Sequence, residues 1–211
     1  MPAERDAEVD AILQSLHFSP VQPTPEFSLL APDADPSQVA ANSAALAAQL
    51  TEMLTLYQDI CFTAYPDEPA VSDAMNARHA RAFSRSEVRR YLHDDPGVGW
   101  ALRGSTGEFV ITIEQPPFRT CAIRTMTVAG FPDAQPYVDF AARVEVGRSA
   151  TSIGSIDRII GNVRTRARGD QYVGADGSNE NLLAFVSTPA SGSGGGAEIR
   201  FARQFVSQGR H

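Results

Sequence analysis

The chain has 211 residues, which favours a single domain, and its hydrophobic fraction of 43% is sufficient to build a core. No apolar run approaches the roughly 18 residues of a membrane-spanning helix. The absence of lysine excludes Schiff-base chemistry, a catalytic Ser–Lys pair and the lysine of a phosphate-binding P-loop. The acidic N-terminus lacks the features of a secretory signal. We therefore expect a cytoplasmic protein if the chain is complete as given, and a periplasmic one if a signal peptide was removed.

The formal net charge of −7 is divided unevenly along the chain. Residues 1–77 contain twelve acidic residues and a single base, Arg5, whereas residues 78–211 contain 17 arginines and 13 acidic residues. Opposite charges favour contact between the two halves, within one fold or between two copies. The acidity of the whole chain makes strong non-specific binding to nucleic acid an unlikely function.

A short amphipathic helix over 5–17 and a proline-rich connector are predicted to occupy residues 1–37. A single α+β domain is predicted to follow over 38–211, and its first part, 38–95, is expected to be helical. Apolar residues that recur at alternating spacings of four and three predict one long helix over 38–64. These residues are Leu46, Leu50, Met53, Tyr57, Ile60 and Ala64. The alanine-rich first half of the helix allows close packing against another helix. A homo-oligomer that forms through the 38–64 helix is therefore one possibility.

A second helix is predicted over 70–83, and the capping-box pattern from Ser84 to Glu87 predicts the start of a third. The hydrophobic period then becomes that of strands, so residues 98–206 are expected to be mainly β. Strands are predicted at 99–103, 108–114, 120–127, 159–168, 181–188 and 198–206, with a helix at 135–146. The expected fold class is α+β: N-terminal helices packed on an antiparallel sheet of about six strands with one crossing helix, in the order βββ–α–βββ.

The chain has two cysteines, Cys61 near the end of the long helix and Cys121 within a predicted strand. Free cysteine is among the most buried residue types, so two thiols in the core are one interpretation. A disulfide that joins the helix to the sheet is the other. The residues alone favour neither.

Several short motifs between residues 50 and 126 belong together. They are the helix that carries Cys61, the segment Ser84–Leu92, the pair Gly99-Trp100, the triplet Gly107-Glu108-Phe109 and the pair Thr120-Cys121. In these motifs the chain resembles a group of small uncharacterised exported proteins of Proteobacteria. The resemblance implies a periplasmic protein with a Cys61–Cys121 disulfide and no known activity.

His79, Glu87 and His93 are the best candidates for a catalytic or metal-binding group. They lie on two neighbouring predicted helices and can converge only if these helices fold back on each other. No histidine is four residues from another, so the ligand pair of a metalloprotease is absent from the sequence. Isolated surface histidines are the more common interpretation, and we predict no metal site.

Arg164, Arg166 and Arg168 alternate with Val163, Thr165 and Ala167. On a strand, this alternation places the three guanidinium groups on one face and Val163 and Ala167 on the opposite, buried face. Such an arginine row suits phosphate or a carboxylate-rich partner. Alternatively, it is a solvated face, or one neutralised by acidic residues that precede residue 78.

No group of residues has catalytic spacing. The expected function is therefore non-enzymatic binding of an unknown protein or a small anionic ligand, without a cofactor. Two alternatives stay open. The first is an enzyme of unrecognised type that uses His79, Glu87 or His93. The second is a nucleic-acid or anion binder that uses the arginine row.

Overall fold

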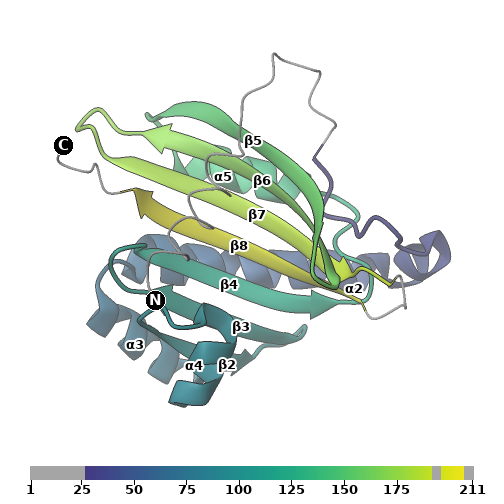
Figure 1. Cartoon of the computed structure of the whole chain (residues 1–211), viewed down its shortest axis with the longest axis horizontal. Helices are drawn as coiled ribbons and strands as arrows, with labels where there is room; N and C mark the ends of the chain where they lie inside the picture. The colour runs from purple at the N-terminus through teal and green to yellow at the C-terminus, as the bar shows by residue number, and fades with distance from the viewer. Residues whose placement is uncertain (1–26, 192–195, 207–211) are drawn as a thin grey trace.

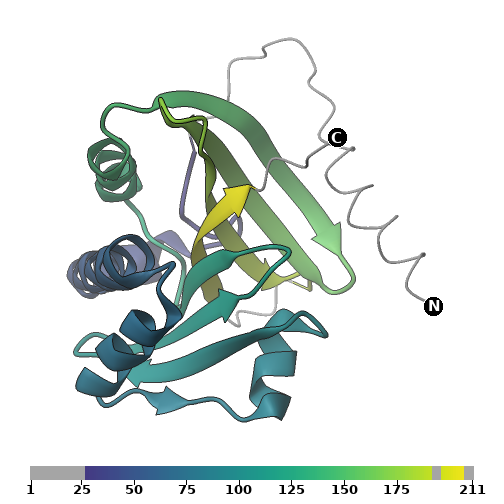
Figure 2. The ribbon, with the colours of Figure 1, turned by 90° about the vertical axis from the view of Figure 1, so that its left-hand side faces the viewer.

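The computed structural model describes residues 27–191 and 196–206, which form one antiparallel sheet with most of the helices packed on one face (Figures 1 and 2). The eight strands lie in the order β1-β2-β3-β4-β8-β7-β6-β5. They are β1 Arg81–Ala82, β2 Gly97–Arg103, β3 Glu108–Glu114, β4 Thr120–Thr127, β5 Ser149–Ile160, β6 Val163–Val173, β7 Asn179–Pro189 and β8 Ala197–Val206. The helices are α2 Pro36–Tyr57, the π-helical η1 Gln58–Ala64, α3 Glu68–Ala77, α4 Arg85–Leu92 and α5 Gln135–Val144. The α+β class is confirmed, and the helix predicted over 5–17 lies outside the described residues.

The long helix predicted over 38–64 is confirmed as one continuous helical segment, α2 followed by η1. It begins at Pro36, where the side chain of Asp35 caps it by accepting a hydrogen bond from the Ser37 amide at 2.8 Å. The five predicted apolar positions from Leu46 to Ile60 are at most 3% exposed. The stripe therefore faces the core from Leu46 to Ile60, whereas the first ten residues of α2 are exposed or half-buried.

The second helix ends earlier than predicted. α3 stops at Ala77, where Arg78 donates a hydrogen bond back to the Ala74 carbonyl at 3.1 Å. His79 then adopts a left-handed backbone conformation, with φ of 56°, and the chain enters the short strand β1 beside β2. The capping box at the start of α4 is confirmed, because Ser84 and Glu87 make both reciprocal hydrogen bonds.

The three strands predicted between residues 99 and 127 are confirmed within two residues at each end. The single strand predicted over 159–168 is wrong, because this segment contains the turn of a hairpin between β5 and β6. The turn requires Gly161, whose φ is 60°. β5 is an edge strand that pairs only with β6, and β1 is a two-residue edge strand at the other end of the sheet. These two strands raise the number from about six to eight.

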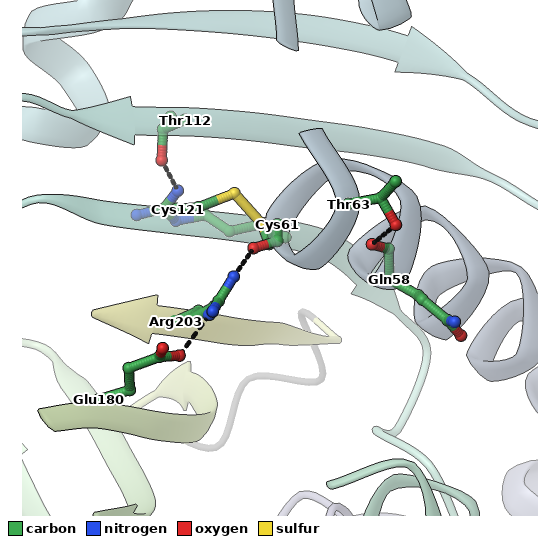
Figure 3. The surroundings of a disulfide bond; sticks show 8 residues. Gln58, Cys61, Thr63, Thr112, Cys121, Glu180 and Arg203 are labelled. Atoms are coloured by element: carbon green, nitrogen blue, oxygen red, sulfur yellow. Dashed lines mark hydrogen bonds and ion pairs between the residues drawn. A yellow bond between two sulfur atoms is a disulfide. The ribbon is translucent and has the colours of Figure 1, made fainter. Parts of the chain in front are cut away.

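A disulfide between Cys61 and Cys121 joins η1 to β4, with the two Cα atoms 5.5 Å apart (Figure 3). Arg203 on β8 supports this junction. It donates to the Cys61 carbonyl at 2.7 Å and to the Glu180 carboxylate at 2.6 Å. The structure therefore supports the disulfide rather than two free thiols. Among the described residues, no helix is long and apolar enough to cross a membrane.

The sheet has two different faces. Helices α2, α3 and α5 cover one face, where Tyr57 of α2 contacts Phe201 of β8 with ring centroids 5.9 Å apart (Figure 2). Side chains alternate along each strand, so the neighbours of these core residues point to the other side. We call that other side the open face. Of the helices in the described part of the chain, the short α4 is the one that lies beside it, at the β2–β3 end of the sheet (Figure 2).

Candidate anion-binding site

The structure places Arg164, Arg166 and Arg168 on one face of β6, as predicted, and each holds a carboxylate of the same half of the chain. Arg164 binds Asp157 through two hydrogen bonds of 2.8 Å, and Arg166 binds the same carboxylate at 3.1 Å. Arg168 binds Asp170 at 3.0 Å. The hydrogen bond from Arg164 holds the pKa of Asp157 below its usual value. These ion pairs favour the structural interpretation of the row, with carboxylates that come from β5 and β6.

The expectation that Val163 and Ala167 are buried is wrong for both: Val163 is 37% exposed, and Ala167 is half-buried. In the register, Arg166 lies opposite Val186 and Arg168 lies opposite Ala184, and both partners belong to the core. The arginine row therefore lies on the helix-covered face. The arginine side chains remain 32–41% exposed there.

His79, Glu87 and His93 are not brought together. Glu87 accepts two hydrogen bonds from Arg81, at 2.8 and 3.1 Å, and these lower its pKa to about 2. Within residues 27–191 and 196–206, no hydrogen bond or ion pair connects Glu87 to a histidine, and no cluster of metal-ligating side chains occurs. His79 and His93 instead occupy the C-terminal ends of α3 and α4.

The open face carries two arginines that the sequence analysis did not single out. Arg124 of β4 and Arg200 of β8 are direct neighbours in the antiparallel register. Arg124 is only 6% exposed, and its Nη1 donates to the Thr112 hydroxyl at 2.7 Å. Its guanidinium carbon also lies 5.5 Å from the centre of the Tyr91 ring on α4.

Arg200 stacks on the ring of Phe185, with the guanidinium carbon 3.7 Å from the ring centre. Its Nε is buried and has no hydrogen-bond partner in the described part of the chain. Burial and the adjacent charge of Arg124 together lower the pKa of Arg200 to about 10. Arg200 thus stays a cation at neutral pH, in a place where a cation is unfavourable.

A cavity of about 130 Å³ lies over the two arginines. Thr112, Thr120 and Gln204 provide polar groups to its wall, and Leu183 and Phe185 provide apolar surface. Glu114 also lines it. The nearest carboxylate contact is that of Glu198, whose Oε1 is 4.0 Å from the Arg124 Nε, at the limit of an ion pair. The cavity therefore offers guanidinium donors to which no carboxylate of the described residues is hydrogen-bonded.

Sequence reasoning missed this site because its parts are distant in the chain. The available signal is an arginine next to a large apolar residue in each strand, Arg124 after Ile123 in one and Arg200 between Ile199 and Phe201 in the other. Strand alternation places each arginine opposite the core. However, it does not reveal that β8 inserts beside β4, which is the pairing that makes the two arginines neighbours.

Comparisons of the chain with protein-family models, with curated proteins and with solved structures find no match. The resemblance to exported proteins of Proteobacteria therefore stays a prediction.

Proposed function

We propose that the protein is a non-enzymatic binding protein that holds a small oxyanion, a phosphate or carboxylate group, between Arg124 and Arg200 on the open face. The observation that carries the proposal is the buried Nε–H donor of the half-buried Arg200, which lies beside the buried Arg124. Like charges directly opposite each other on neighbouring strands are destabilising, and burial increases the cost. An oxyanion would neutralise both charges and accept the free hydrogen-bond donors.

The chemistry of the cavity supports this ligand class. Guanidinium groups bind carboxylate and phosphate in a planar, bidentate manner, and the chain has no lysine to take this role. The Thr112 hydroxyl lines the same cavity; it accepts a hydrogen bond from Arg124 and can donate its own hydrogen to an oxyanion oxygen. At about 130 Å³, the cavity matches a phosphate-sized group rather than a large ligand. The negative charges of Glu114 and Glu198 act on Arg200, so they weaken the binding of an anion that enters the cavity.

Thermal melting of the full chain tests the proposal. Inorganic phosphate should raise the melting temperature of the wild type in a saturable manner, because it binds the folded state only. Sodium chloride at the same ionic strength should not. The variant Arg200→Gln should lose the phosphate effect, whereas Arg164→Gln, which removes the same charge from the arginine row, should keep it. An equal phosphate effect in Arg200→Gln and the wild type would refute the site.

We further infer that the protein functions in an oxidising compartment, as the resemblance to exported proteins implies. The Cys61–Cys121 disulfide supports this inference, because such bonds are rare in the reducing cytosol. Intact mass after alkylation in denaturant tests it on the protein purified from its native source. We expect no label without reductant and two labels with reductant. Two labels without reductant would show that the native protein carries free thiols.

A further inference from the structure

A second cavity, of about 300 Å³, lies on the helix-covered face, between α5 and β6. Its wall is mainly aromatic and apolar: Phe27, Tyr137 and Tyr172 line it together with alanines of α5. Tyr137 and Tyr172 are 4% and 8% exposed, and Tyr137 stacks on Phe201 of the core with ring centroids 4.5 Å apart. The walls are thus fixed by packing. The volume is at the lower end of the roughly 300–1,000 Å³ range of small-molecule sites.

A buried carboxylate forms the polar part of this cavity. Glu145 follows the last residue of α5 and is only 5% exposed. Its Oε2 has no hydrogen-bond partner among residues 27–191 and 196–206. The Arg148 Nε is 3.3 Å from this oxygen, close enough for an ion pair, but its N–H is not aligned for a hydrogen bond.

The other charged groups around Glu145 are already matched. Arg203 of β8 donates to Glu180 of β7 at 2.6 Å, and the Arg148 Nη1 lies 2.7 Å from the other oxygen of Glu180, again without hydrogen-bond alignment. On the β6 side of the cavity, Arg168 holds Asp170. Arg148 is therefore shared between two carboxylates. The ion pair of Arg148 with Glu145 is the weaker of the two, because its N···O distance of 3.3 Å is longer than the 2.7 Å to Glu180.

We propose that this cavity binds a small molecule with an apolar body and a protonated amino group, whose N–H donates to the Glu145 Oε2. A cation with N–H donors suits the place, since the buried Glu145 Oε2 lacks a hydrogen-bond partner in the described part of the chain and aromatic rings line the wall. The hydrogen bond would satisfy a buried acceptor that otherwise costs stability. The site is on the opposite face of the sheet from Arg200 and does not depend on the proposed oxyanion site.

The ionisation state of Glu145 determines how the binding of the amine changes with pH. Burial, and next the negative charge of Glu180, raise the pKa of Glu145 to about 6. Arg148 and Arg203 act in the opposite direction but do not cancel the shift. An ammonium group pairs with the ionised carboxylate, so its binding should weaken as the pH falls below 6.

Ligand-observed NMR on the full chain at pH 7.5 tests the proposal, with benzylamine as the probe and benzyl alcohol as its uncharged counterpart. Benzylamine should bind in a saturable manner, at least tenfold more tightly than benzyl alcohol. Glu145→Gln should weaken benzylamine at least tenfold, whereas Glu198→Gln, which removes a carboxylate from the open face, should leave it unchanged. Circular dichroism verifies that both variants are folded.

Three results would overturn the proposal. Equal binding of benzylamine and benzyl alcohol would show that only the apolar wall is used. Unchanged binding in Glu145→Gln would place the amine elsewhere. No saturable binding of benzylamine would remove the site altogether. The variant Arg200→Gln should bind benzylamine like the wild type, which separates this site from the oxyanion site.

Discussion

The pKa values of two glutamates, Glu52 and Glu145, shift in opposite directions, and the number of hydrogen-bond donors around each carboxylate explains the difference. Glu52 on α2 accepts hydrogen bonds from the amides of Ser105 and Thr106, both at 2.8 Å, and from their hydroxyls. Burial raises its pKa, but these hydrogen bonds, led by that of the Thr106 hydroxyl, outweigh burial and lower it overall. Glu145 is buried without such donors, and its pKa is raised. Residue type alone does not distinguish the two glutamates, so the sequence could not predict which of them has a buried oxygen without a hydrogen-bond donor.

The raised pKa of Glu145 predicts a stability that falls as the pH rises. In the folded protein Glu145 loses its proton near pH 6, whereas in the unfolded chain it loses the proton near 4.5. The burial of the charged carboxylate therefore lowers the free energy of unfolding increasingly between these two pH values, and the loss is complete above 6. Glu145→Gln mimics the protonated form. We expect it to be more stable than the wild type at pH 7.5, by on the order of 1 kcal/mol, and nearly equal to it at pH 4.5.

Urea unfolding of both proteins at the two pH values measures this difference directly. The comparison with the wild type removes the contributions of the other carboxylates, which are common to both proteins. A Glu145→Gln variant that is less stable at pH 7.5 would show that the ion pair with Arg148 outweighs the burial of the charge.

Elements with a strong apolar period were predictable, and elements without one were not. The stripe from Leu46 to Ile60 fixes the long helix and its buried side, because only a helix brings these positions together. β5 lacks such a period, since it is an edge strand with serine, threonine and glycine residues and a largely exposed burial pattern. Its last two residues, Ile159 and Ile160, are 61% and 55% exposed. In the sequence, these two isoleucines look like the start of a buried strand, which is why a strand is predicted to begin at 159.

The position of the long helix against the sheet predicts the cost of truncating its stripe. Leu50 is 2% exposed, and its replacement by alanine should leave a cavity that neighbouring side chains fill only partly. We expect Leu50→Ala to lower the free energy of unfolding by roughly 2–5 kcal/mol. Chemical denaturation measures this change, with the exposed Thr51→Ala as the matched control on the next position. A cost below about half a kcal/mol would mean that the stripe does not pack against the sheet.

At the scale of the whole molecule, the two faces of the sheet carry different chemistry. The helix-covered face holds the core, the disulfide and the arginine row, whose charges are matched within the sheet. The open face holds Arg124 and Arg200, whose charges are only loosely matched by Glu198. Alternation along the strands predicts which side chains share a face of one strand. The neighbours across the sheet depend on the strand order, and the insertion of β8 beside β4 was not readable from the sequence.

Arginine-selective NMR of the Nε–H groups tests the oxyanion site most directly, because it observes the donor that should bind the ligand. The variants Arg200→Gln and Arg164→Gln identify the two signals by their disappearance. We expect inorganic phosphate to shift the Arg200 signal to a plateau and to leave the Arg164 signal in place, because the Arg164 Nε–H already donates to Asp157. A shift of the Arg164 signal with no shift at Arg200 would contradict it and would assign anion binding to the arginine row.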